Sequence, residues 1–428
     1  MDERGVPVLK TRILYVHPCA GLGGAPLSLL YLIQQLDRDR FAPEVLLTGR
    51  AGEEAPLFLQ QGIPVHFRPD ITTYPHARNA HLSLRSLRPW ELLTRAVQIL
   101  PSARRMHRFL KEHAFDLVHL NTSVLLPAGI GASRADVRVV WHIREPLHPG
   151  MLGLRRRVVA TIIRRCADAI VAISESDAEP WAGDPKLKIV YNVVDFGRFN
   201  RAIDGDEFRL RCGLPQERPI IAMLGGTIHS KGTDVLIEAA AHVKEKRPDA
   251  LFVVAGAAPG GGESPSPLRR VVRRALERSG VVPSMDRRVL KLMEVRRLHD
   301  TVRFVGLRQD IPEMLAAATL LVWPATVPHF ARPIIEAGAM ALPVVASGYA
   351  VTREVVVPGK TGLLVRPGDP RSLAEAIIHL LDHPEEARRL GEAAFAIARD
   401  RHDAAHNARQ VMAVYDGLMS SARAETDT

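Results

Sequence analysis

Short apolar runs recur along the first half of the chain, and stretches with helical spacing separate most of them. Runs of this kind, bounded by polar or turn-forming residues, are typical of buried strands. They predict strands at 13–16, 44–47, 65–67, 117–120, 137–141, 169–173 and 188–191, with an apolar helix at 27–36. Strands that alternate with helices form mostly parallel sheets covered on both faces, and these sheets bind ligands at the carboxyl ends of their strands.

The same alternation begins again in the second half. Apolar runs predict strands at 219–224, 251–255, 302–305, 320–323 and 343–346, and helical patterns cover 233–245, 372–381, 384–399 and 404–419. Polar, turn-rich segments at 200–206 and 213–219 lie between the halves. We therefore predict an α/β protein with two doubly wound domains at 1–200 and 201–402, followed by a helix and tail at 403–428. A Gly/Pro/Ser-rich linker and two basic helical stretches, 268–279 and 284–298, predict an insert at about 257–300.

A glycine-rich loop follows the first predicted strand. Gly21, Gly23 and Gly24 lie there, but their spacing does not fit the GxGxxG dinucleotide fingerprint. Two interpretations stay open: a tight turn, or a loop that a ligand approaches closely because it lacks side chains. His142 follows the predicted strand 137–141 and so lies at the same edge of the sheet, either as a structural histidine or as one that contacts a ligand.

A second glycine-rich turn follows the first strand of the second domain. Gly225, Gly226 and Thr227 lead to Lys231, which precedes the predicted helix 233–245. This is not a P-loop, because the GxxxxGK[ST] spacing fails at the second glycine and after Lys231. A lysine in this place can still neutralise a diphosphate, with backbone N–H groups assisting.

The stretch 322–356 combines a buried strand, a polar loop, a helix with Pro333 in its first turn, and a second buried strand. The backbone N–H groups of Phe330, Ala331 and Arg332 lie at the start of this helix and form an anion site. Arg332 and Glu336 are four positions apart and therefore project from one face of the helix. We interpret the stretch as a binding loop, although many α/β proteins carry a glutamate in the first turn of a helix.

The order of residues across this stretch resembles the donor-site signature of family 4 (group 1) glycosyltransferases. The matching positions are Pro324, Phe330, Glu336-Ala337, Ala339-Met340-Ala341, Pro343-Val344-Val345-Ala346 and Arg353-Glu354-Val355. Segments 191–195, 359–365 and 367–370 are similar to the family as well. The resemblance implies the GT-B fold, in which two Rossmann-like domains face a cleft and the last helix crosses back to the first domain. It also implies retaining transfer from a nucleoside-diphosphate sugar to a glycan or lipid-linked acceptor in polysaccharide or glycolipid synthesis, without a cofactor or metal.

The resemblance assigns roles to residues of this chain. Lys231 corresponds to the lysine that contacts the donor phosphates, Glu336 to the glutamate on the ribose, and His142 to a histidine near the transferred sugar or acceptor. The implied catalytic residues are His142 and Glu336. The implied donor-binding residues are Gly23, Gly24, Gly225, Gly226, Thr227, Lys231, Phe330, Ala331, Arg332 and Glu336.

The chain departs from the family pattern at two positions. Pro328 stands where the family has the first of two glutamates, which contacts the sugar, and Gly226 stands where it usually has an arginine. Arg332 can take the place of that arginine on the phosphates. The departures favour one alternative, a catalytically inactive GT-B scaffold or partner protein in polysaccharide assembly. A nucleotide-sugar epimerase or hydrolase is a third hypothesis, for which Glu145 is the candidate acid/base carboxylate.

Composition changes this picture in a few respects. The formal net charge of +10 indicates a polyanionic partner, but aromatic residues make up 5% and no nucleic-acid-binding motif occurs, so we expect no nucleic-acid partner. Three separated cysteines without a CxxC motif indicate neither a disulfide framework nor a zinc site. Without a long apolar run or signal segment, we expect a cytoplasmic protein. Basic helical stretches at 84–111, 154–165 and 268–298 indicate either solvated helices or peripheral contact with the anionic inner face of the plasma membrane.

Overall fold

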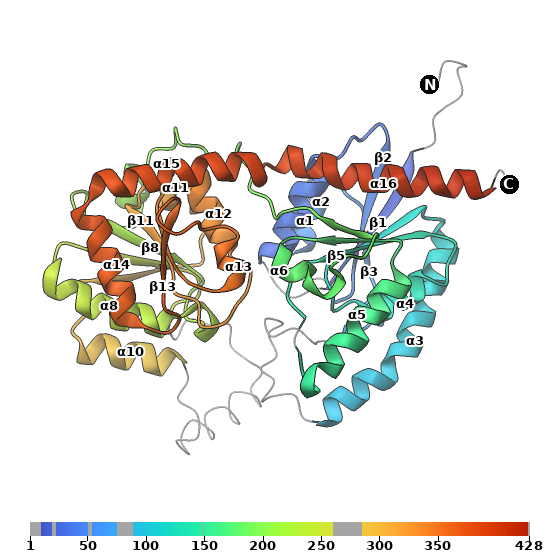
Figure 1. The fold of residues 1–428 in the computed structure, drawn as a ribbon, viewed down its shortest axis with the longest axis horizontal. Coiled ribbons are helices and arrows are strands. Elements are labelled where there is room, and N and C mark those ends of the chain that lie inside the picture. The colour runs from blue at the N-terminus through green and yellow to red at the C-terminus, as the bar shows by residue number, and fades with distance from the viewer. Residues whose placement is uncertain are drawn as a thin grey trace. The chain divides into compact units, whose positions relative to one another are not determined.

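The computed structural model describes residues 10–18, 23–49, 54–74, 89–147, 149–259 and 285–426. The chain forms two compact units, which we call the first unit (Met1–Val193 with His402–Thr428) and the second unit (Val194–Arg401). Each unit contains its own parallel sheet with helices on both faces (Figure 1). The chain therefore leaves the first unit after Val193 and returns to it at His402, whereas the sequence predicted a boundary at 200.

The first unit has a seven-stranded sheet in the order β3-β2-β1-β4-β5-β6-β7, with every described pair parallel. Its elements are β1 (Thr11–His17), α1 (Gly24–Gln34), β2 (Phe41–Leu47), α2 (Ala55–Leu59), β3 (Val65–Phe67), α3 (Pro89–His113), β4 (Leu117–Leu120), α4 (Leu126–Ala132), β5 (Arg138–Ile143), η1 (Met151–Gly153), α5 (Leu154–Cys166), β6 (Ala169–Ala172), α6 (Glu175–Ala178), η2 (Glu179–Trp181), β7 (Leu187–Ile189) and α16 (Ala404–Thr426). The strand order reverses its direction between β1 and β4, which is the topological switch point of this sheet.

The second unit has a six-stranded parallel sheet in the order β10-β9-β8-β11-β12-β13. Its elements are α7 (Asp206–Arg211), β8 (Ile220–Leu224), η3 (His229–Lys231), α8 (Thr233–Lys246), β9 (Leu251–Ala255), α10 (Met285–Val295), β10 (Val302–Gly306), α11 (Ile311–Ala316), β11 (Leu320–Trp323), α12 (Arg332–Ala339), β12 (Val344–Ser347), α13 (Ala350–Arg353), β13 (Gly362–Val365), α14 (Pro370–Asp382) and α15 (Pro384–Arg401). Its switch point lies between β8 and β11.

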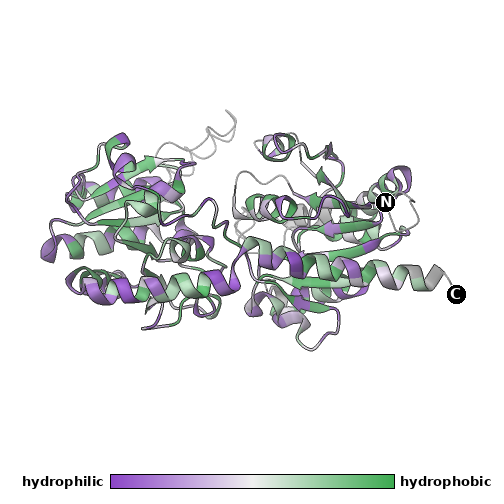
Figure 2. Cartoon of the chain, turned by 90° about the horizontal axis from the view of Figure 1, so that it is seen from above, coloured by the Kyte–Doolittle hydropathy of each residue, from purple (hydrophilic) through white to green (hydrophobic). Residues whose placement is uncertain are grey.

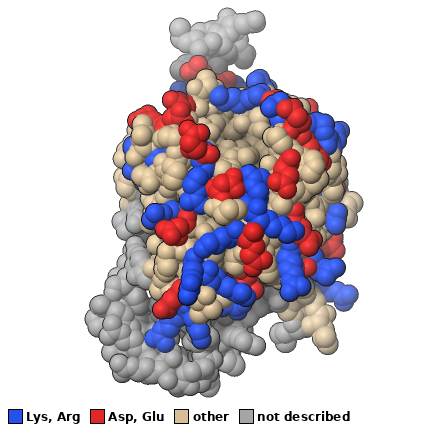
Figure 3. All heavy atoms as spheres, turned by 90° about the vertical axis from the view of Figure 1, so that its left-hand side faces the viewer, with Lys and Arg blue, Asp and Glu red and all other residues tan. Residues whose placement is uncertain are grey.

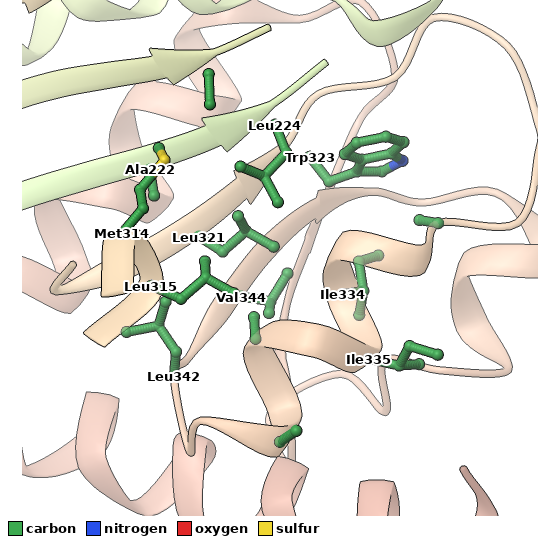
Figure 4. Close-up of a cluster of buried hydrophobic side chains, with 14 of the residues drawn as sticks. Ala222, Leu224, Met314, Leu315, Leu321, Trp323, Ile334, Ile335, Leu342 and Val344 are labelled. Atoms are coloured by element: carbon green, nitrogen blue, oxygen red, sulfur yellow. The ribbon is translucent and has the colours of Figure 1, made fainter. Parts of the chain in front are cut away.

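The central strands are apolar on both faces because helices cover both sides of each sheet. All residues of β9 and of β11 are buried, and Figure 2 shows strands of this kind as apolar ribbons inside more polar helices. In the second unit, Leu321 and Trp323 of β11 pack together with Ile334 of α12 in one core cluster (Figure 4). The core thus fixes the position of α12 against the end of β11.

Helix α16 is part of the first unit. Its side chains Ala408, Val411 and Tyr415 are buried in the core that covers one face of the first sheet, and it contacts α1. The Tyr415 hydroxyl lies 3.1 Å from that of Tyr15 on β1. The last long helix therefore completes the core of the unit that the chain left some 200 residues earlier.

The structure confirms the predicted fold class of two doubly wound Rossmann-like sheets. The predicted strand 343–346 lies one residue later, as Val344–Ser347, and β13 (Gly362–Val365) forms where no strand was predicted. The predicted helix 284–298 corresponds to α10. The predicted helix 268–279 and Gly21 lie outside the described residues, as does the start of the basic stretch 84–111.

Candidate functional site

The predicted site residues of the second unit gather at its topological switch point. Strand β8 ends at Leu224 and leads through the glycine-rich turn to Lys231 in η3. Strand β11 ends at Trp323 and leads through a loop to α12, which carries Glu336. Since β8 and β11 are neighbouring parallel strands, both loops leave the same edge of the sheet, where α/β proteins bind their ligands.

The turn after β8 is fixed by its own backbone hydrogen bonds. The N–H groups of Gly225 and Gly226 both donate to the Ala255 carbonyl at 2.9 Å, and the N–H and hydroxyl of Thr227 both donate to the Ala257 carbonyl. We predicted from the sequence that backbone N–H groups of this turn assist in binding a phosphate. The N–H groups of Gly225, Gly226 and Thr227 already donate to backbone carbonyls. Gly226 has a φ of +60°, and a Cβ added to it would lie 2.4 Å from the Ala257 nitrogen.

A second glycine brings η3 against the end of β11. Gly232 has a φ of +78°, and a Cβ on it would lie 1.8 Å from the Pro324 carbonyl oxygen. Only glycine combines this backbone conformation with so close an approach. Lys231 is therefore held beside the residues that follow β11.

Lys231 contacts a histidine that the sequence analysis did not identify. Its Nζ lies 2.7 Å from His329 Nε2 and 4.7 Å from the centre of the Trp323 ring, a distance suited to a cation–π contact. His329 Nδ1 lies 2.9 Å from the Val327 carbonyl oxygen. A carbonyl can only accept, so Nδ1 carries the ring proton and Nε2 accepts from Lys231.

His329 is buried and Lys231 is partly buried. Burial lowers the pKa of Lys231 to about 8. Burial, followed by the positive charge of Lys231, lowers the pKa of His329 to about 4. At neutral pH the pair therefore consists of a lysine ammonium and a neutral imidazole.

Helix α12 carries the predicted ion pair. Arg332 Nε donates to Glu336 Oε1 at 2.6 Å, and each residue is 7% exposed, so the predicted contact between the two is present. Ala331 is buried at the N-cap, and Phe330 packs against the core beside it. The Nε of Arg332 is thus engaged in holding the carboxylate of Glu336.

In the first unit, His142 stands near the end of β5 and belongs to a buried chain of hydrogen bonds. Its Nδ1 lies 3.0 Å from His119 Nε2, and His119 Nδ1 lies 2.7 Å from the Tyr415 hydroxyl. Arg144 Nη2 lies 3.4 Å from the same Nδ1 of His142. The chain connects β5 through β4 to helix α16, and all three rings are buried.

Arg144 determines which atoms donate and which accept in this series of hydrogen bonds. A guanidinium only donates, so Nδ1 of His142 accepts and Nε2 carries its proton. His119 then donates through Nε2, and the Tyr415 hydroxyl donates to His119 Nδ1. Burial is the main cause that lowers the pKa of His142 well below its usual value and that of His119 to about 3, so both are neutral.

The Nε2 of His142 has no hydrogen-bond partner among the described residues. His142 lines a cavity of about 20 Å³ together with Ser28, Arg144 and Asn192. This volume holds about one water molecule. The arrangement therefore offers one N–H donor that the fold itself does not use.

The neighbouring residues have mainly structural partners. The Glu145 carboxylate accepts from the Thr122 hydroxyl and from the N–H and hydroxyl of Ser123. The carboxylate named for an acid/base role therefore holds the loop that follows β4. Gly23, the N-cap of α1, and Gly24 are exposed at the end of β1, on the switch-point side of the first sheet.

The structure thus brings together Lys231 with Arg332 and Glu336 around the switch point of the second unit, and it places Gly23, Gly24 and His142 in the first unit. His329, His119 and Tyr415 are contacts that the sequence analysis missed. The one signal for His329 is its place beside Pro328 in the signature stretch. Within the described ranges, no group of three or more His, Cys, Asp or Glu side chains is arranged to hold a metal ion.

Two family models match the chain in sequence. Residues 22–198 match the glycosyltransferase family 4 model, and residues 204–396 match the glycosyl transferases group 1 model. Together they cover most of both units.

Curated relatives are similar over more than half of the chain. The lipopolysaccharide core biosynthesis mannosyltransferase LpsB of Rhizobium meliloti is 28% identical over 304 residues, which are 65% of this chain and 80% of that protein. The alpha-maltose-1-phosphate synthase of Mycolicibacterium smegmatis is 30% identical, over 64% of this chain and 71% of that protein. The match to the D-inositol 3-phosphate glycosyltransferase of Streptomyces scabiei, at 30% identity, covers 57% of this chain and about half, 52%, of that relative.

Solved structures share the fold. HepE of Anabaena, in complex with UDP and glucose, has a TM-score of 0.71 at 23% identity, over 95% of this chain and 99% of that chain. WaaG, a glycosyltransferase involved in lipopolysaccharide biosynthesis, has a TM-score of 0.62 at 16% identity, over 94% and 98%. With the family models and the relatives, this fold shows that the chain belongs to the glycosyl transferases group 1 and is a glycosyltransferase of the GT-B fold.

Proposed function

We propose that this glycosyltransferase takes its sugar from a nucleoside-diphosphate donor held at the switch point of the second unit. The observation that carries the proposal is the partly buried Lys231 ammonium beside Trp323, at the carboxyl edge between β8 and β11. The carboxylate of Glu336 lies on α12, which starts at the same edge. A cation and a carboxylate on loops and helices that leave the same edge of the sheet suit a ligand that has both phosphates and ribose hydroxyls.

The proposed chemistry follows from these groups. A diphosphate leaves during transfer, and an ammonium held at the developing charge lowers the barrier. Glu336 binds the ribose hydroxyls, and the N–H of His142 orients the sugar or the acceptor hydroxyl. The acceptor is a glycan or a lipid-linked sugar, and support for this comes from the relatives named for lipopolysaccharide core synthesis.

Calorimetric titration with UDP, GDP and ADP tests the donor site. We expect one of the three to bind, and Lys231→Ala and Glu336→Gln each to weaken its binding by about 1–3 kcal/mol, which is a factor of about 5 to 150. Lys246→Ala, at an exposed position on α8, is the matched control and leaves the affinity unchanged. If none of the nucleotides binds to the unaltered protein, the donor proposal is wrong.

Arg332 has a supporting role in the same proposal. It keeps the Glu336 carboxylate in place, so Arg332→Ala leaves a buried carboxylate without its partner and weakens nucleotide binding. Arg371→Ala changes an exposed arginine and serves as the comparison. Equal effects of the two changes would exclude a role for Arg332 in the donor site.

The proposal includes retention of the anomeric configuration and transfer without a bound metal, as the family resemblance implies. NMR of the product from an α-linked donor is expected to give the α-anomer, and activity is expected to survive dialysis against EDTA. A β-linked product would contradict the first expectation. Activity that is lost with EDTA and regained with a divalent cation would contradict the second.

We also propose that the first unit binds an anionic membrane surface, the inner face of the plasma membrane, through η1 and α5. Leu152 is fully exposed, and Leu154 and Val158 are about half exposed. Arginines lie along the same helix at Arg155, Arg156, Arg157, Arg164 and Arg165. Exposed apolar side chains next to arginines are typical of helices that lie on anionic lipid.

The basic helix of the second unit carries ion pairs, as α5 does through Arg156 with Glu179 and Arg164 with Asp184. Arg288 of α10 lies 3.3 Å from Asp234 and 3.4 Å from Glu238. On the face drawn in Figure 3, Lys and Arg side chains have Asp and Glu side chains between them. Among the described residues, no helix is both long enough and apolar enough to span a bilayer.

Vesicle flotation tests the membrane proposal. The protein is expected to float with vesicles that contain anionic lipid at low salt and to be released at high salt. Leu152→Ser combined with Arg157→Ala reduces the floating fraction, whereas the same two kinds of change at Leu290 and Arg287 of α10 do not. No protein recovered with anionic vesicles at low salt would rule the proposal out.

A further inference from the structure

The contact between Lys231 and His329 affects how the second unit binds a diphosphate. The imidazole is neutral, and its only N–H, at Nδ1, is 2.9 Å from the Val327 carbonyl oxygen. Its Nε2 lone pair accepts from the Lys231 ammonium at 2.7 Å. The ring is also packed 5.3 Å from the Trp323 ring, so it is held from both sides. In the free protein the imidazole therefore presents a lone pair to the place where Lys231 stands.

A diphosphate that takes the place of Lys231 in front of Nε2 meets the lone pair of the imidazole. Phosphate oxygens only accept hydrogen bonds, and an acceptor that faces the Nε2 lone pair is repelled. If Lys231 turns all three of its N–H groups to the phosphate, Nε2 loses its donor, and a buried acceptor without a partner is destabilising. A proton on Nε2 removes both the repulsion of the phosphate and the loss of a hydrogen-bond partner, because it turns the lone pair into a charged donor.

Two other positions that could supply a second cation are restricted. Gly226 cannot carry a longer side chain, since an added Cβ would lie 2.4 Å from the Ala257 nitrogen. The Nε of Arg332 donates to Glu336. A diphosphate carries more negative charge than one ammonium neutralises, so a second positive group beside Lys231 stabilises the complex.

We propose that binding of the nucleoside diphosphate takes up one proton on His329 Nε2, so that an imidazolium and the Lys231 ammonium hold the diphosphate together. The proton comes from the solvent and returns to it when the nucleotide leaves. The inference rests on the proposed donor site and assigns that site a second, titratable cation. His329 is on this view a phosphate ligand that the bound anion itself creates.

The charges around His329 favour its protonation when the nucleotide binds. In the free protein Lys231, from η3, is the charged group in hydrogen-bond contact with His329, and its charge opposes protonation. Among the described residues of the adjoining elements, Asp234 lies 3.6 Å from His229 and 3.3 Å from Arg288, and Arg332 lies 2.6 Å from Glu336. A bound diphosphate places several negative charges beside the ring and so favours the imidazolium.

Calorimetry in buffers with different ionisation enthalpies counts the protons exchanged on binding. The titration uses the nucleotide that binds best among UDP, GDP and ADP, at pH 7. We expect the full chain to take up about one proton more per bound nucleotide than the His329→Gln variant does. Between pH 6 and 7.5, the nucleotide affinity of the full chain is expected to fall with rising pH more steeply than that of the variant, by up to about an additional tenfold per pH unit. The comparison with the variant removes the contribution from the phosphate groups of the nucleotide.

The glutamine variant separates titration from positioning. A glutamine side chain can accept from Lys231 but cannot take up a proton, so it keeps the fold and loses the proton linkage. His299→Gln changes an exposed histidine and keeps the proton uptake of the unaltered protein. Nucleotide binding with the same uptake in the full chain and in His329→Gln would overturn this inference alone. No binding of any nucleotide would instead overturn the proposed donor site on which it rests.

Discussion

Gly226 shows why one departure from the family pattern cannot be reversed by a single substitution. The residue has a φ of +60°, and a Cβ there would meet the Ala257 backbone at 2.4 Å. Gly226→Arg is therefore expected to destabilise the second unit by more than the roughly 1–2 kcal/mol that a side chain costs in this backbone region. It is also expected not to strengthen nucleotide binding, as thermal unfolding and calorimetry would measure.

A second glycine provides the control for this change. Gly359 has a φ of +71°, and no heavy atom lies within 4 Å of an added Cβ. Gly359→Arg carries the cost of the backbone conformation without the clash. If the two variants unfold at the same temperature, or if Gly226→Arg binds nucleotide more tightly, the backbone at 226 does not exclude a side chain.

Single residues were predictable where their role follows from local sequence. Lys231 after a glycine-rich turn, and Arg332 four positions before Glu336, could be read from spacing alone. The contact of Lys231 with His329 joins residues 98 positions apart, and it depends on the register of η3 against the end of β11. No local pattern contains that register, so this contact needed the structure.

At the scale of elements, the bounds of several short apolar runs were predicted best, most of them buried on both faces, with the partly exposed β3 as the exception. The strands β3, β4, β9 and β11 have the bounds that the apolar runs predict. Strand β13 was missed because it is partly exposed at its centre, and because the turn-forming sequence Gly359-Lys360-Thr361 leads directly into it. The return of α16 to the first unit follows from the family resemblance and is confirmed. Its individual contacts could not be predicted, since the packing of a helix on a distant sheet leaves no mark in its own periodicity.

Helix α16 contributes a hydroxyl to the buried chain that ends at His142, and this leads to a prediction. In the unaltered protein, long-range ¹⁵N–¹H spectra are expected to show His119 and His142 both protonated at Nε2. Tyr415→Phe removes the donor to His119 Nδ1 and leaves a buried acceptor without a partner. We expect a loss of stability of about 1–3 kcal/mol and a mixture of tautomers at His119.

Tyr15→Phe is the matched control, because it removes the hydroxyl at the far end of the chain. It leaves the Tyr415–His119 hydrogen bond in place, so the tautomers are expected to stay as in the unaltered protein. A spectrum of the unaltered protein with His142 protonated at Nδ1 would show that Arg144 does not set the direction of the chain.

At the scale of the whole molecule, the two units differ in how they are built from the chain. The second unit is one continuous segment, Val194–Arg401, and it contains the complete group of Lys231, His329, Arg332 and Glu336. The first unit is made of two segments, because α16 returns to cover its sheet. Cutting the chain at 401 should therefore affect the units unequally.

We expect residues 194–401, produced alone, to unfold cooperatively and to bind the same nucleotide as the full chain within about threefold. Two buried clusters support independent folding, since they pack both faces of the six-stranded sheet with residues from this segment alone. Residues 1–401, in contrast, lose the buried side chains Ala408, Val411 and Tyr415, and their first unit is expected to unfold at a lower temperature. Calorimetric unfolding of both fragments beside the full chain measures this difference. A segment 194–401 that folds but does not bind nucleotide would mean that the first unit supplies essential donor contacts.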